Sequence, residues 1–369
     1  MRTQIAEKFG LEVPIFAFSH CRDVVAAVTK AGGMGILGAA WMSPEELEMS
    51  LKWIDERVDG KPYGVDLVFP GTFVDAGSPD EHVAKLPEDY IAYVDRILDD
   101  AGVAKFPEED RDPFFREYAQ KMSMTHAKSK RQFEISLQHA TKFIVGALGV
   151  PQKEIVEQAH AKGVLVGALV GNVRHVEKQI AAGVDVLVAQ GTEAGGSVGS
   201  ISSMVLWPQV VEAAGGRPVL AAGGIGRGSQ ILAALSLGAQ GVWMGSIWLG
   251  TTESELSKEM KQQFFNADTE DAVISYSMTS KQGRMLRSRF TDAWEQPGAP
   301  KPLTWPLQSI LVGYPYRRAD RGRRLDYWTY SVGQIVGDMK EEMSVRQLIE
   351  KLLVEYVDAL ERLKSVTAE

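Results

Sequence analysis

Glycine-rich stretches directly follow three apolar runs in the second half of the chain. They read AQGTEAGGSVGS at 189–200, AAGGIGRGS at 221–229 and MGS at 244–246. Because glycine has no Cβ, backbone N–H groups in such stretches can approach an anion closely. A tight turn alone would explain any single glycine pair, but pairs at neighbouring strand ends favour anion binding. The phosphate site predicted on this basis consists of Gly223, Gly224, Gly245 and Ser246.

Two residues are candidates for acid–base chemistry. Ser197 stands directly after a glycine pair, where a reacting group is expected, and His20 follows the first apolar run in FAFSHCRD. A serine hydroxyl cannot take a proton at neutral pH without a base beside it, whereas an imidazole can. His20 has a second interpretation, as an ordinary strand-end residue that begins a helix. The sequence leaves both interpretations of His20 open.

Other ligand signatures do not occur in the sequence. No G-x-G-x-x-G follows the first apolar run, and no G-x-x-x-x-G-K-[ST] is found. These patterns mark dinucleotide-binding folds and nucleotide-hydrolysing folds. The sequence therefore supports neither kind of protein.

The elements that must position these residues alternate regularly along the chain. Eight apolar runs are each bounded by turn residues, and most precede an amphipathic segment. The runs lie at 13–18, 34–39, 63–69, 142–148, 164–170, 184–190, 217–224 and 239–246. Apolar strands that alternate with helices indicate parallel βαβ units. Eight units predict an α/β protein with a (β/α)8 TIM barrel and its site at the carboxyl ends of the strands. A doubly wound sheet is the alternative.

Two parts of the chain fall outside this alternation. The barrel is expected from residues 1–70 and 141–250. Residues 71–140 are charged and contain prolines, which predicts a helical insertion after strand three that lies over the barrel mouth. Residues 251–369 predict a mostly helical extension that packs on the barrel and ends in a strongly amphipathic helix.

Composition narrows the range of partners. The 369 residues are 45% hydrophobic, carry a formal net charge of -8 and contain one cysteine. An acidic chain without a long basic block is a poor partner for nucleic acid or an anionic membrane. One cysteine forms no internal disulfide, and no apolar run reaches the roughly 18 residues of a membrane span. We expect a soluble, cytoplasmic protein, with a homodimer as its candidate assembly.

Three stretches resemble the nitronate monooxygenase family, formerly called 2-nitropropane dioxygenases. They are AQGTEAGGS, PVLAAGGIGRGSQILAALSLGAQGVWMGS, and PIFAF followed by AVTKAGGMGILGAA. The similarity covers about residues 1–70 and 142–250, and the insertion and tail resemble a long-chain actinobacterial branch. This resemblance implies a (β/α)8 barrel that binds FMN and needs no metal. It also implies oxidation of alkyl nitronates by O2 to a carbonyl compound and nitrite.

The same resemblance assigns roles to individual positions. Ala17 and Phe18 are expected under the isoalloxazine ring, and Gln190 is expected to reach polar atoms of the cofactor. Asp66 stands near the ring, where the family usually has Asn, so an acceptor replaces an amide donor. The FMN phosphate and ribityl chain are assigned to Gly195, Gly196, Gly223, Gly224, Gly245 and Ser246.

The chain departs from the family at one catalytic position. The family has A-G-G-H after strand six, with histidine as the base, and this chain has Ser197 there. A nitronate is already deprotonated and needs no base, so only the use of neutral nitroalkanes loses support. One alternative function is FMN-dependent dehydrogenation or reduction of an enoyl or hydroxyacyl thioester. Another, from a different class, is a non-catalytic flavin-binding protein.

Overall fold

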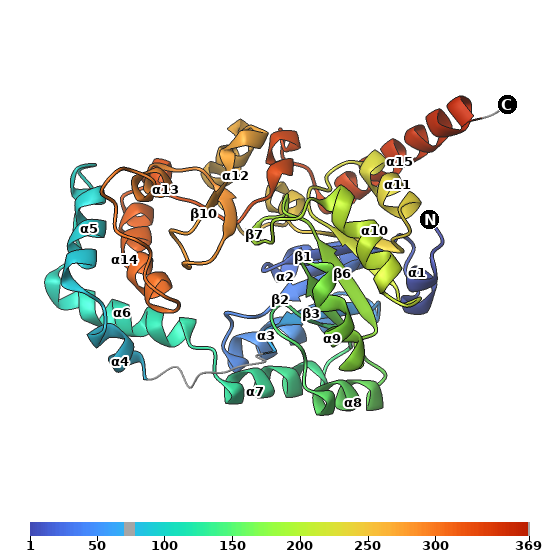
Figure 1. Cartoon of the computed structure of the whole chain (residues 1–369), viewed down its shortest axis with the longest axis horizontal. Helices are drawn as coiled ribbons and strands as arrows, with labels where there is room; N and C mark the ends of the chain where they lie inside the picture. The colour runs from blue at the N-terminus through green and yellow to red at the C-terminus, as the bar shows by residue number, and fades with distance from the viewer. Residues whose placement is uncertain (70–77, 368–369) are drawn as a thin grey trace.

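Eight parallel strands close into a barrel in the order β1-β2-β3-β4-β5-β6-β8-β9, with β9 pairing back onto β1 (Figure 1). The computed structural model describes residues 1–69 and 78–367, so the predicted start of the insertion at 71 lies outside the described residues. The strands are β1 Ile15–Ser19, β2 Met34–Gly38, β3 Tyr63–Leu67, β4 Thr141–Gly146, β5 Leu165–Val170, β6 Val186–Gln190, β8 Val219–Ala222 and β9 Gly241–Met244. The predicted TIM barrel is confirmed, and the doubly wound alternative is wrong.

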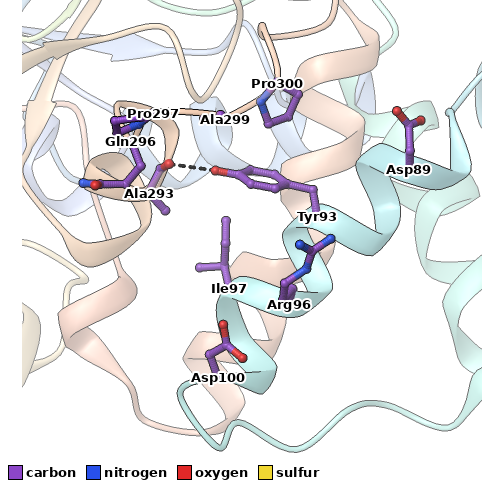
Figure 2. A pocket seen from close by; sticks show the side chains of 11 residues that line it. Asp89, Tyr93, Arg96, Ile97, Asp100, Ala293, Gln296, Pro297, Ala299 and Pro300 are labelled. Carbon is purple, nitrogen blue, oxygen red and sulfur yellow. Dashed lines mark hydrogen bonds between the residues drawn. The ribbon is translucent and has the colours of Figure 1, made fainter.

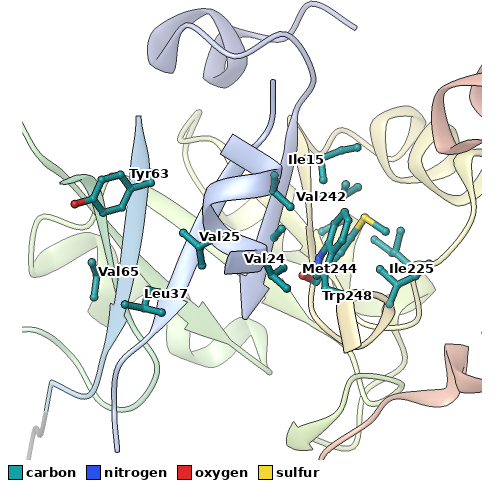
Figure 3. Close-up of a cluster of buried hydrophobic side chains, with 14 of the residues drawn as sticks. Ile15, Val24, Val25, Leu37, Tyr63, Val65, Ile225, Val242, Met244 and Trp248 are labelled. Carbon is teal, nitrogen blue, oxygen red and sulfur yellow. Dashed lines mark hydrogen bonds between the residues drawn. The ribbon is translucent and has the colours of Figure 1, made fainter. Parts of the chain in front are cut away.

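Alternation along each strand separates two apolar layers. One layer fills the inside of the barrel, where Phe16, Ile36 and Phe143 are fully buried in the same cluster of side chains. The residues between them, such as Ile15 and Leu37, face outward and pack against the helices, where Figure 3 shows Val24 and Val25 of the first barrel helix among them. Burial on both faces is what a parallel sheet requires, and it explains why the barrel strands are mainly apolar.

Helices surround the barrel. They are α2 Arg22–Lys30, α3 Pro44–Asp55, α7 His126–Ser136, α8 Lys153–Ala161, α9 Val176–Ala181, α10 Ser203–Ala213, α11 Gly228–Ser236 and α15 Val345–Thr367. α15 packs against both α11 and α2, so this last helix takes the place of the eighth barrel helix. At the opposite end of the chain, α1 Gln4–Phe9 closes the amino-terminal end of the barrel through Ile5 and Phe9.

A second hydrophobic core lies outside the barrel. It joins three helices of the predicted insertion with two of the C-terminal part: α4 Pro79–Ala84, α5 Glu88–Asp99, α6 Glu108–Met122, α13 Arg289–Trp294 and α14 Leu307–Arg321. This lobe lies on the side of the barrel away from α1 (Figure 1). α7 instead packs on β3 and α3, as the helix of the third βα unit. The prediction that the inserted part covers the barrel mouth stays a prediction.

The C-terminal part also contains strands that the sequence did not indicate. β10 Ala272–Ser275, β11 Gly283–Leu286 and β7 Gly196–Ser197 form an antiparallel sheet. The remaining elements are α12 Lys258–Asn266 and the 3₁₀ helices η1 Val173–His175, η2 Ser246–Gly250, η3 Thr269–Asp271, η4 Leu325–Tyr327 and η5 Gln334–Asp338. Within the described residues no helix is both long enough and apolar enough to cross a membrane.

Candidate functional site

Inward-facing residues of five strands gather at the carboxyl end of the barrel. The strand alternation places Phe18, Gly38 and Asp66 at the ends of β1, β2 and β3, and Gln190 and Trp243 at the ends of β6 and β9. Gly38 pairs in register with Asp66. The rings of Phe18 and Trp243 stack with their centroids 6.0 Å apart and an interplanar angle of 27°. This end of the barrel therefore offers flat apolar surface beside a few polar groups, as ligand sites commonly do.

Open backbone donors mark the ends of β8 and β9. Among the described residues, the N–H groups of Gly224, Gly245 and Ser246 donate to no protein acceptor. A Cβ on Gly245 would meet only Phe18, at 3.8 Å, so the space beside this amide is free. The Ser246 hydroxyl accepts a hydrogen bond from Gly333 N at 2.8 Å and keeps its own hydrogen for donation. Unpaired donors of this kind suit an anion.

Close packing explains why two other positions of the predicted phosphate site are glycine. A Cβ on Gly195 would lie 2.8 Å from the Cα of Val332, and a Cβ on Gly223 would lie 2.7 Å from Ser203 Oγ. Their missing side chains therefore make room for the chain itself. Gly196, with φ 77°, belongs to β7 and pairs with Arg284. Binding of a ligand by these three glycines stays a prediction.

Ser197 lies on the small antiparallel sheet rather than among reactive groups. Its side chain is exposed, and its hydroxyl has no hydrogen-bond partner among the described residues. Its carbonyl accepts a hydrogen bond from Gln190 Nε2 at 2.9 Å, which fixes the Gln190 amide. With no histidine or carboxylate bonded to it, the Ser197 hydroxyl has nothing to activate it as a base.

His20 is held in a defined orientation by β2. Its Nδ1 lies 2.8 Å from the carbonyl oxygen of Gly38, and its ring makes an edge contact with Phe18 at a centroid distance of 5.1 Å. A Cβ on Gly38 would lie 2.7 Å from Nδ1, so the imidazole occupies the space that this glycine leaves. The side chain of His20 is nevertheless exposed. His20 thus lies over the inner face of β2 and is open to a ligand.

Asp66 is a buried carboxyl group without a partner. It is 3% exposed, faces the barrel interior at the end of β3, and makes no side-chain hydrogen bond among the described residues. Burial raises the pKa of this carboxyl well above its usual value, because no cation or donor offsets the cost of desolvating the charge. Burial therefore favours the protonated form of this carboxyl, which carries one O–H donor.

Two residues near His20 in the sequence, Ala17 and Cys21, offer no reactive side chain. The side chain of Ala17 is fully buried in the outer apolar layer, so only its backbone could face a ligand. Burial raises the pKa of the Cys21 thiol, which donates to the carbonyl oxygen of Glu253 at 3.3 Å. A buried thiol with a raised pKa is not a nucleophile.

Residues that the sequence analysis missed complete this end of the barrel. The first is Trp243 on β9, whose position inside the barrel the alternation of inward and outward residues along that strand could have indicated. Glu193 accepts hydrogen bonds from Ser203 N and, at 2.7 Å, from Ser203 Oγ, which fixes the start of α10. The buried Arg284 guanidinium donates to the carbonyl oxygen of Thr192 at 2.9 Å and holds the same loop. No local pattern indicates these contacts, because each partner lies on a distant segment.

A hollow of about 480 Å³ lies elsewhere, on the second lobe, between α5 and residues 293–300 (Figure 2). Tyr93 OH donates to the carbonyl oxygen of Ala293 at 2.7 Å across it, and Asp89, Arg96 and Asp100 lie around it. None of the predicted site residues lines this hollow. The barrel end remains the candidate site.

The barrel end fits the cofactor that the sequence implies. A phosphate needs unpaired N–H donors, which Gly224, Gly245 and Ser246 provide, and a flat ring needs surfaces such as those of Phe18 and Trp243. A metal ion has no comparable site, since the described residues hold no group of three or more His, Cys, Asp or Glu side chains that could bind one.

The closed (β/α)8 barrel has open N–H donors at the ends of its last two strands, the place where enzymes of this fold commonly bind phosphate. The family described as nitronate monooxygenase matches residues 4–355, and the chain belongs to that family. It is therefore an oxidoreductase. A putative monooxygenase, Rv1533 of Mycobacterium tuberculosis, is 44% identical over 99% of both chains. A probable nitronate monooxygenase of Staphylococcus haemolyticus is 28% identical over 97% of both.

Solved structures share the fold at lower identity. A nitroalkane oxidase from Streptomyces ansochromogenes superimposes with a TM-score of 0.77 at 24% identity, covering 97% of this chain and 99% of that one. A mutant of FabK from Thermotoga maritima gives 0.74 at 23%, covering 99% and 100%. An enoyl reductase domain of MlnA from Bacillus amyloliquefaciens gives 0.64 at 13%, covering 99% and 98%. At such identities these likenesses concern the fold alone.

Proposed function

We propose that this protein is an FMN-dependent nitronate monooxygenase that converts alkyl nitronates and O2 to a carbonyl compound and nitrite. Family membership supports the reaction class. The observation that carries the assignment of the site is the set of open N–H donors at Gly224, Gly245 and Ser246. FMN is preferred over FAD because the chain has no fingerprint for an adenine dinucleotide. When bound, FMN supplies the electron-transfer chemistry that side chains cannot.

The residues of this chain then have binding and positioning roles. Gly224, Gly245 and Ser246 hold the phosphate. Asp66 contributes a buried carboxyl group whose raised pKa favours the O–H form. Gln190 keeps its side-chain carbonyl oxygen free, because its amide donates to the carbonyl oxygen of Ser197. A nitronate arrives already deprotonated, so its oxidation does not depend on a base at position 197. The substrate is a small molecule.

The alternative function is reduction or dehydrogenation of an enoyl or hydroxyacyl thioester. One of the solved structures of this fold is an enoyl reductase domain, which is the observation in its favour. Anaerobic titration separates the two functions. We expect the bound flavin to be bleached by an alkyl nitronate and not by an acyl thioester or by NAD(P)H. Bleaching by the latter reagents alone would replace the proposed function with the alternative.

Colour and mass identify the cofactor itself. We expect the purified protein to be yellow and the released cofactor to have the mass of FMN. A colourless protein, or release of FAD, would contradict the proposal. A flavin that none of these reagents bleaches would support the non-catalytic interpretation.

Location and assembly belong to the same proposal. A single buried cysteine is compatible with a reducing compartment, and we place the protein in the cytoplasm on that ground. For assembly we propose a homodimer. Light scattering during gel filtration tests this, since one chain has a mass of 40.5 kDa.

A further inference from the structure

The orientation of His20 bears on which substrates the site accepts. We propose that His20 is the base that removes the α-proton of neutral nitroalkanes, so that these compounds are substrates beside the nitronates. The inference rests on the proposed nitronate chemistry and extends it to the protonated substrate. His20, directly after β1, would supply the base that the Ser197 hydroxyl cannot be.

The first argument is the tautomer that β2 imposes. A carbonyl oxygen only accepts hydrogen bonds, so the 2.8 Å contact with Gly38 O places the ring hydrogen on Nδ1. In the neutral ring Nε2 then carries a free lone pair. Among the described residues Nε2 has no partner that would occupy this lone pair. A fixed ring with a free nitrogen is the arrangement that a general base requires.

The second argument is position. Gly38 faces the barrel interior, and a Cβ there would lie 2.7 Å from both Nδ1 of His20 and the ring of Phe18. The glycine therefore lets these two rings lie over the inner face of β2. Gly38 also pairs with Asp66, so the imidazole lies one strand away from the buried acid. His20 is at the same time exposed, which gives a substrate access to it.

The proposed step balances without any further reactant. The Cα–H bond of the nitroalkane breaks, its proton goes to Nε2, and its electron pair forms the C=N bond of the nitronate. The nitronate is the substrate of the proposed oxidation, and the imidazolium returns its proton to solvent. A positioned base typically accelerates such a step about 10²–10⁴-fold.

Ionisable groups on the surrounding elements are few. Burial raises the pKa of the Asp66 carboxyl on β3, which favours its uncharged form beside the imidazole. Glu255 acts electrostatically on the adjacent Cys21 thiol, and Glu253 bonds the start of α15 at Val345 N. The proton that His20 takes up is therefore not shared with a bonded carboxylate, as it would be in a triad.

The experiment measures proton removal separately from oxidation. Anaerobic holoenzyme is incubated with nitroethane in D2O, and loss of the α-hydrogens is followed by NMR. Nitrite formation in air is measured in parallel from nitroethane and from preformed ethyl nitronate. Three variants are compared with the wild type. His20→Gln can still donate to the carbonyl oxygen of Gly38 but is no base, and His20→Ala leaves room for added imidazole. His160→Ala is the control. His160 lies on α8, bonded to Asp185.

We expect both His20 variants to slow α-hydrogen exchange at least about 100-fold, with imidazole restoring exchange in His20→Ala. The wild-type exchange rate should rise with pH to a plateau, and this rise should vanish in His20→Gln. Nitrite formation from nitroethane should fall far more than that from ethyl nitronate, and His160→Ala should match the wild type. Exchange in His20→Gln at the wild-type rate overturns the inference, even if nitronates are oxidised. Failure to oxidise ethyl nitronate, with His20-dependent exchange intact, contradicts the proposed function instead.

Discussion

The backbone segments at Gly195 and Gly333 pass so close to each other that neither residue has room for a side chain. A Cβ on Gly333 would lie 3.0 Å from Gly195 N, and a Cβ on Gly195 would lie 2.9 Å from Gly333 N. Beside this crossing, Gln334 N donates to the carbonyl oxygen of Glu193 at 2.9 Å. Two segments that are far apart in sequence therefore meet in the loop after β6 through close backbone contacts.

This crossing predicts that Gly195→Ala destabilises the fold. The φ of Gly195 lies outside the left-handed region, so the added methyl group acts by overlap with the backbone of Val332 and not by dihedral strain. We expect a loss of about 1–3 kcal/mol in the free energy of unfolding. Denaturant unfolding measures it, with Gly245→Ala as the control, since a Cβ there meets only Phe18 at 3.8 Å. Equal stability of the two variants would contradict the close crossing.

Gly245 also offers the sharpest test of the phosphate site. A side chain fits there without strain, so Gly245→Asp should fold while placing a carboxylate beside the open N–H donors. Gly245→Asn has nearly the same shape without the charge. Repulsion between the carboxylate and a phosphate should weaken FMN binding at least about tenfold in the aspartate variant relative to the asparagine variant. Titration of cofactor-free protein with FMN, followed by fluorescence, measures both. Equal affinities would place the phosphate elsewhere.

The barrel was predictable because its determinants are local. Each buried strand is a short apolar run next to turn residues, and the pattern of Ser43, Pro44 and Glu46 begins α3 as a capping box. The glycine pairs were also recognised, but not the reason for Gly195, whose partner lies on a segment beyond residue 330. No local pattern reports such a contact.

The second lobe was unpredictable for a similar reason. Its core combines α4–α6 with α13 and α14, which are separated in sequence by more than half of the barrel. Likewise, the amphipathic pattern of α15 predicts a helix but not its place between α11 and α2. The same holds for His20, since the sequence cannot tell that Gly38 leaves space for its ring.

Arg318 links α14 to α5, and its loss should destabilise the second lobe. Its buried guanidinium donates to Asp95 Oδ1, to Asp99 Oδ1 and to the carbonyl oxygen of Val103, each at 2.7 Å. We expect Arg318→Leu to cost about 3 kcal/mol, at the low end for a broken buried ion pair because Asp99 is partly exposed. Proteolysis between residues 78 and 122 should become faster. Arg346→Ala, which breaks an exposed pair with Glu350, is the control.

Asp66 should make the stability of the cofactor-free protein depend on pH. Burial raises its folded-state pKa well above the ordinary 3.8, so its contribution is fully present below pH 3.8 and is lost as pH rises toward the folded-state pKa. In that range the wild type should lose about 1.4 kcal/mol per pH unit relative to Asp66→Asn, which does not titrate. Denaturant unfolding at pH 5, 6, 7 and 8 measures the difference, with the exposed Asp100→Asn as the control. We expect the Asp66→Asn advantage to widen with pH. An advantage that is constant across these four values would mean that Asp66 is already ionised in the folded protein at pH 5, and would contradict the prediction.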